Sequence, residues 1–132
     1  MLKFISNGSA LNVKRGNNSA YIKKGNKAFI IDSGSDVFST IKKKRILEDV
    51  EEINLYITHT HSDHVGSIGD LVFYTFFGLK PILKNKIKIL TVKDTNTKEV
   101  LDLMGCMEKN VWHGDEIFDE LRGDIHAWIL YM

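Results

Sequence analysis

ITHTHSDHVGS, residues 57–67, places three of the chain's five histidines and one aspartate within six consecutive positions. His59 and His61 are two residues apart, so in an extended segment both side chains leave on the same side. Asp63 and His64 follow where an apolar strand ends and the chain turns toward a helix. Ligands bind at this end of the strands in α/β sheets, and imidazole and carboxylate groups bind zinc, manganese or iron. The cluster therefore predicts a metal site.

Composition limits the remaining function classes. The chain has 132 residues, 43% of them hydrophobic, which predicts a single domain over residues 1–132 with a packed core. Its net charge of +1 gives no general reason to expect nucleic acid or an anionic membrane as partner. The single cysteine, Cys106, excludes a disulfide framework within the chain. With no signal peptide and no apolar stretch near the roughly 20 residues of a membrane span, we expect a cytoplasmic protein without a membrane partner.

Hydrophobic patterns and turn residues predict an α/β (α+β) chain with a mixed sheet. The expected strands are residues 2–5, 20–23, 27–32, 53–58 and 84–90, and the expected helices are residues 35–47, 67–77 and 97–104. Gly25-Asn26 predicts a hairpin turn, and Gly78 predicts the end of the second helix. A turn at residues 114–117 is expected to lead into a strand. The basic run at residues 42–45 is expected to be a solvated face.

The motif THTHSDHVGS resembles the signature T-H-x-H-x-D-H-x-G-[GS] of the metallo-β-lactamase-fold hydrolases. IIDSGS (residues 30–35) resembles the strand and turn before that motif, and HGDEI (residues 113–117) resembles a Gly-Asp turn downstream of it. The opening NGSALN…NNSAYI is similar to the hairpin of the ribonuclease Z-like and small phosphodiesterase-like branches. The resemblance implies an αββα sandwich with two metals at its edge, zinc first, with manganese or iron as alternatives.

The resemblance also implies roles for individual residues. His59 and His61 match ligands of the first metal, and Asp63 and His64 match ligands of the second. Asp32 matches a residue behind the ligand loop that accepts a hydrogen bond and orients it. In such sites a metal-bound hydroxide attacks an ester, amide or phosphodiester, and Asp63 is expected to help orient it as the catalytic carboxylate. His61 stands where the oxygen-reducing flavodiiron relatives usually have Glu, which favours hydrolysis.

The sequence departs from the family downstream of the motif. The family completes its site with a third histidine in a P-G-H turn, a bridging aspartate and a last histidine, and this sequence contains no such turn. The remaining histidines and two downstream aspartates match no ligand position: His113, His126, Asp115 and Asp124. The chain ends in the apolar DIHAWILYM, which resembles the strand just before the missing turn. We therefore expect about the N-terminal half of the family's sandwich.

Three functions remain open at this level. The first is a metal-dependent hydrolase; a phosphodiester or nucleic-acid substrate is favoured by the N-terminal resemblance, with a thioester or another small molecule as the alternative. The second is a truncated, inactive remnant that binds metal weakly. The third is a homodimer in which two chains supply ligands to each other.

Overall fold

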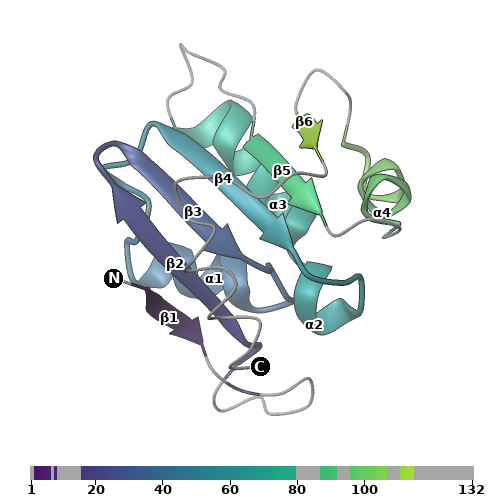
Figure 1. Cartoon of the computed structure of the whole chain (residues 1–132), viewed down its shortest axis with the longest axis horizontal. Helices are drawn as coiled ribbons and strands as arrows, with labels where there is room; N and C mark the ends of the chain where they lie inside the picture. Colours follow the sequence, from purple (N-terminus) through teal and green to yellow (C-terminus); the bar gives the residue numbers. More distant parts are fainter. Residues whose placement is uncertain are drawn as a thin grey trace.

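The computed structural model describes residues 2–6, 8, 16–79, 87–91, 96–106 and 111–114. These residues form one mixed six-stranded sheet whose spatial order follows the sequence (Figure 1). The strands are β1 (Lys3–Ser6), β2 (Ser19–Lys24), β3 (Lys27–Ile31), β4 (Glu52–Ile57), β5 (Ile87–Thr91) and β6 (Val111–Gly114). The pairs β1–β2 and β2–β3 are antiparallel, whereas β3–β4, β4–β5 and β5–β6 are parallel. The mixed sheet predicted from the sequence is confirmed.

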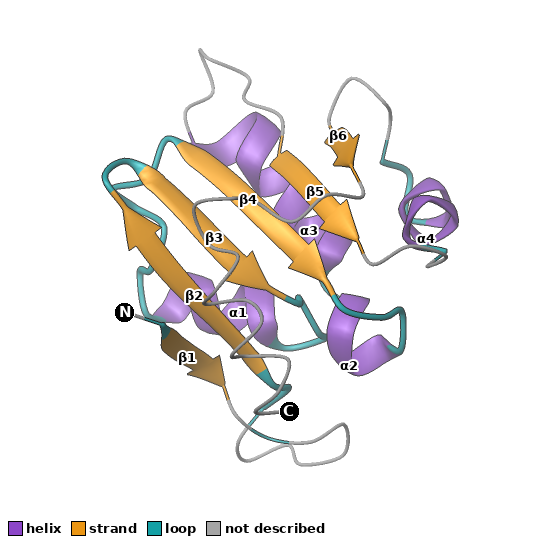
Figure 2. Ribbon diagram, in the orientation of Figure 1, coloured by secondary structure: helices purple, strands orange, loops and turns teal. Residues whose placement is uncertain are grey.

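Short helices accompany the sheet. They are α1 (Val37–Lys43), α2 (Ser62–Val65), α3 (Ile68–Phe73), the π-helix η1 (Tyr74–Leu79) and α4 (Thr97–Leu103). Figure 2 shows α1 and α3 against one face of the sheet and α2 beyond the end of β4. In the part of the chain that the structure describes, no helix is long and apolar enough to cross a membrane.

Strand alternation divides the buried side chains between the two faces of the sheet. On β3, Ala28 and Ile30 join the main core with the helices, whereas Phe29 and Ile31 belong to a second buried cluster. The main core also takes Ile87 and Ile89 of β5, while Lys88 between them is exposed. The alternation of lysine and isoleucine therefore correctly predicted a half-buried strand. β3 pairs on both sides and is buried, as its apolar run predicts.

The first predicted helix is shorter than expected. α1 ends at Lys43, and Arg45 follows in the left-handed conformation, with φ of +57°. Arg45 N donates to Lys42 O at 3.2 Å and Ile46 N donates to Ile41 O at 3.1 Å, the two bonds of a Schellman motif. This position is usually glycine, and because it is arginine here the sequence did not predict that the helix ends at this point. Ile46 and the following leucine are buried beyond the helix, and residues 42–45 are exposed as predicted.

The second predicted helix also differs. α3 continues into η1 through Gly78 to Leu79, so Gly78 does not end it. Within it, the buried Thr75 Oγ1 donates to Leu71 O at 2.7 Å, a side-chain bond that competes with the regular helical pattern. Gly114 is the last residue of β6, and the turn and strands expected after it lie outside the described residues.

Candidate metal centre

Two neighbouring parallel strands bring the predicted site residues together. β3 ends at Ile31 and β4 ends at Ile57, so Asp32 and the histidine segment leave the same edge of the sheet. Asp32 N still donates to Tyr56 O at 2.9 Å, but its φ of +61° takes it out of the strand that was predicted to include it. Aspartate is one of the residues that tolerate this left-handed conformation. The turn at Asp32 aims its carboxylate across the end of β4.

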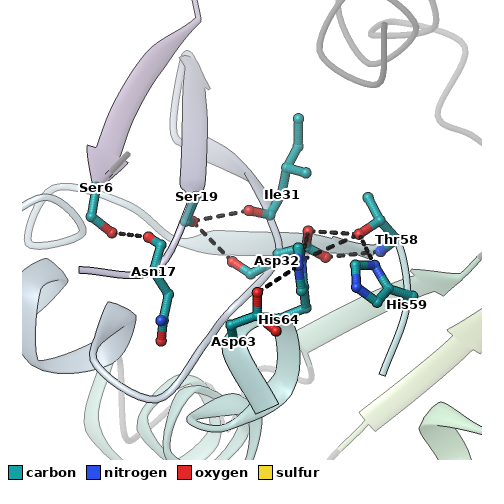
Figure 3. Close-up of polar contacts among 9 residues, drawn as sticks. All are labelled: Ser6, Asn17, Ser19, Ile31, Asp32, Thr58, His59, Asp63 and His64. Carbon is teal, nitrogen blue, oxygen red and sulfur yellow. Dashed lines mark hydrogen bonds and ion pairs between the residues drawn. The ribbon is translucent and has the colours of Figure 1, made fainter. Parts of the chain in front are cut away.

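The Asp32 carboxylate is completely buried and accepts three hydrogen bonds (Figure 3). Its Oδ1 accepts from Thr58 N at 2.8 Å, and its Oδ2 accepts from Thr58 Oγ1 at 2.7 Å. Oδ2 also lies 2.6 Å from His64 Nδ1. A buried carboxylate needs such donors, and together they fix the orientation of the threonine and of the imidazole.

Two glycines allow the loop after β3 to pack tightly against the segment around α2. A Cβ at Gly34 would lie 2.2 Å from Asp63 O, and a Cβ at Gly66 would lie 2.3 Å from Ser35 Oγ. In the same contact, Ser33 N donates to His64 O at 2.7 Å. The backbone of the predicted ligands Asp63 and His64 is therefore held directly against the loop that carries Asp32.

Hydrogen bonding assigns the ring nitrogens of the two inner histidines. Thr58 gives its hydroxyl proton to Asp32, so at 3.1 Å its oxygen accepts from His59 Nδ1. His64 Nδ1 donates to Asp32 in the same way. Each imidazole is thereby left with Nε2 as its outward nitrogen, the arrangement that metal-ligating histidines usually have.

His59, Asp63 and His64 form a group with metal-ligand spacing. One ligand atom from each lies within 4.8 Å of the others, and the rings of His59 and His64 have centroids 3.7 Å apart. His64 Nε2 lies 3.1 Å from Asp63 Oδ2. Two ligands about 2.0–2.1 Å from a tetrahedral zinc lie about 3.3 Å from each other, and the His64–Asp63 pair has nearly this spacing. The nitrogen and oxygen donors of the group are of the kind that zinc binds.

The two inner histidines differ in proton affinity. Burial lowers the pKa of His59, and the neighbouring positive charges of His64 and His61 lower it further. Burial also opposes a charge on His64, but its bonds to Asp32 and Asp63 outweigh that cost and raise its pKa. Without metal, protonated His64 can therefore donate to both carboxylates, whereas His59 favours the neutral form that a metal requires.

His61 lies at the rim of this group. Its side chain is exposed, and its ring stands 4.9 Å from the ring of His59 at 80°. The structure therefore brings three of the four predicted ligands together with Asp32 and leaves His61 beside them. Thr58, the first residue of the quoted motif, was not singled out from the sequence, although it bonds to both Asp32 and His59. His113 lies in β6, and the other three residues judged not to be ligands lie outside the described residues.

This fold and site define a class of protein. The chain resembles human tRNase Z, short form, with a TM-score of 0.61 at 19% identity, over 85% of this chain and 42% of that one. It also resembles the metallo-β-lactamase fold protein YhfI from Bacillus subtilis, with a TM-score of 0.60 at 19% identity, over 89% of this chain and 45% of that one. The chain therefore has the metallo-β-lactamase fold, matching a little under half of each structure, and the resemblance inferred from the histidine motif is confirmed.

The family can be stated more narrowly. The sequence profile of "Anti-Pycsar protein Apyc1" matches residues 1–118, and the chain belongs to this family. The Apyc1 protein of Paenibacillus sp. (strain J14) is 38% identical over 85 residues, covering 62% of this chain and 34% of that protein. The Apyc1 protein of Bacillus phage BSP38 is 35% identical over 80 residues, covering 59% and 30%. The matched segment thus spans about a third of these relatives.

Proposed function

We propose that this chain is a metal-dependent hydrolase that cleaves a phosphodiester bond of a nucleotide. The observation that carries the proposal is the group of His59, Asp63 and His64, whose ligand atoms lie within 4.8 Å of one another, with Asp32 bonded to His64 behind it. His61 is the fourth proposed ligand. Zinc is the metal that suits this nitrogen and oxygen set best, with manganese or iron as alternatives.

Each residue has a proposed task in the reaction. A bound divalent metal supplies Lewis-acid activation of water and stabilises negative charge on the phosphoryl oxygens. Asp32 holds His64 in the tautomer whose Nε2 faces the site, and Thr58 does the same for His59. The Asp63 carboxylate accepts a proton or hydrogen bond from the attacking water and so orients it.

Family membership and the N-terminal sequence support the substrate class. The opening of the chain resembles the ribonuclease Z-like and small phosphodiesterase-like branches, which favours a phosphodiester. The chain's relatives are named for opposing Pycsar, and we infer that degradation of a nucleotide is how a member of this family does so. The proposal is for a nucleotide; RNA or another nucleic acid is the alternative.

An incomplete site is the competing proposal, and a specific observation favours it. The matched segment spans about a third of the relatives, and the described residues group three ligand atoms rather than a full set for two metals. In that case the chain binds at most one ion weakly, or two chains complete the site as a homodimer.

Metal content separates a completed site from an incomplete one. Elemental analysis of protein purified without chelator should give close to two metal ions per chain if the full set of ligands for two metals is present. It should give none, or a fraction of one ion, if ligands are missing. Size by light scattering then tests the homodimer, because a monomer with a full metal content rules it out.

Hydrolysis of bis(4-nitrophenyl) phosphate with added zinc or manganese tests the activity itself. His61→Ala should abolish the metal-dependent rate, whereas the exposed control Asp102→Asn should keep it. A His61→Ala rate equal to that of the unsubstituted chain would refute the hydrolase proposal.

A further inference from the structure

The segment between His59 and His61 is bonded to a distant part of the chain. Thr60 Oγ1 donates a hydrogen bond to Asn96 Oδ1, across 36 positions of sequence. Thr60 is half-buried and Asn96 is exposed at the surface. The hydrogen bond therefore holds the residue that separates His59 from His61 in the metal motif.

Sheet topology explains why these two residues meet. β4 and β5 are parallel neighbours, and Ile57 at the end of β4 pairs with Thr91 at the end of β5. Segments that follow these two ends leave the same edge of the sheet. Asn96 is the residue before α4, a position where asparagine commonly caps a helix with its side-chain oxygen. Here it makes no such capping bond, and its oxygen accepts from Thr60 instead.

His61 is the proposed ligand that this bond affects most. Thr58 orients the ring of His59, and Asp32 orients the ring of His64. Among the described residues, the ring of His61 has no such hydrogen bond. Its backbone is fixed on one side by α2, because His61 O accepts from His64 N at 2.9 Å and from Val65 N at 3.1 Å. Thr60 lies on its other side.

We propose that Asn96 is a positioning residue, which holds the backbone of His59-Thr60-His61 through Thr60 and so sets where His61 meets the metal. This inference rests on the proposed function, because it assumes that His61 is a ligand. The bond orders the segment during folding, so that less conformational freedom is lost when metal binds. Loss of the bond should weaken metal binding by about 10-fold or more, the usual size of effects transmitted through groups behind metal ligands.

The test compares Thr60→Val, which keeps the shape and removes the hydroxyl, with Thr60→Ser, which keeps the hydroxyl. Asn96→Ala and the double variant complete a cycle. Amide hydrogen exchange of residues 59–61 is measured in metal-free protein, and zinc affinity is measured by competition with a chromophoric chelator. Thr60→Val and Asn96→Ala should each speed exchange and weaken zinc binding, Thr60→Ser should do neither, and the double variant should be no worse than the single variants.

Two results would overturn the inference. One is a Thr60→Val protein with the exchange and zinc affinity of the unsubstituted chain. The other is a double variant whose losses are the sum of the single losses, because the two side chains would then act independently. If the unsubstituted chain binds no zinc, the proposed function and the metal-positioning role both fail, whereas unchanged values in a chain that does bind zinc overturn the positioning role alone.

Discussion

Replacing Asp32 by Asn should weaken metal binding and also destabilise the metal-free fold, by free energies of similar size. Asparagine has nearly the same shape and also tolerates the left-handed backbone at this position. Its amide, however, offers one acceptor oxygen and one donor nitrogen where the carboxylate offers two acceptors. If the oxygen keeps the bond from Thr58 N, the nitrogen faces Thr58 Oγ1 and His64 Nδ1.

The hydroxyl can rotate to accept from this nitrogen, but His64 can accept only by moving its proton to Nε2. That tautomer turns a donor toward Asp63 and removes the lone pair that a metal would use. We expect zinc affinity to fall by about 10- to 100-fold. The loss of charge-assisted bonds to a buried carboxylate should lower the free energy of unfolding of metal-free protein by about 1–3 kcal/mol.

Zinc titration against a competing chelator and urea unfolding in the presence of EDTA measure the two effects. Asp36→Asn is the matched control, because Asp36 Oδ1 accepts from Asn17 N at 2.9 Å and is bonded to no histidine in the described residues. This variant should lose some stability and keep its zinc affinity. An Asp32→Asn protein that binds zinc as tightly as the unsubstituted chain would refute the tautomer argument.

Three further changes test the fold around the site. Arg45→Gly should raise the melting temperature by about 2–4 °C in thermal unfolding, because glycine adopts the left-handed conformation without strain. Arg45→Ala should not raise it, and equal melting temperatures of the glycine and alanine variants would contradict a strained helix end. Gly66→Ala should cost about 1–3 kcal/mol in urea unfolding, since its Cβ would lie 2.7 Å from a backbone carbonyl. Gly25→Ala meets no atom within 4 Å but must adopt a φ of +61°, so it should cost about 1 kcal/mol, from backbone strain that the less flexible unfolded chain partly offsets. Burial, with nearby carboxylates, raises the pKa of the Cys106 thiol. The folded chain therefore favours the neutral thiol, and this preference contributes its full stability below the unfolded-state pKa of about 8.5. That contribution to stability is lost as pH rises through the folded-state pKa. The stability difference between this chain and Cys106→Ala should thus shift in favour of the alanine variant as pH rises above about 8.5, and a constant difference would count against a raised pKa.

The sequence predicted the elements whose signals are local. Alternation along β5 and the continuous apolar run of β3 identified buried strands because side-chain burial follows the strand period. Gly105, with φ of +81°, marked the end of α4 correctly because glycine is the residue that usually occupies this conformation. The histidine motif is local as well, so the candidate metal site could be located and its fold family inferred before any contact was known.

The tertiary structure decided how that motif is held. Asp32 and His64 are 32 positions apart and Thr60 and Asn96 are 36 apart, and each pair meets because parallel neighbouring strands end at one edge of the sheet. The left-handed Arg45 carries no sequence signal of its own. Sequence patterns record which residues are buried or turn the chain, whereas the direction in which a side chain donates depends on partners that only the folded chain brings within bonding distance.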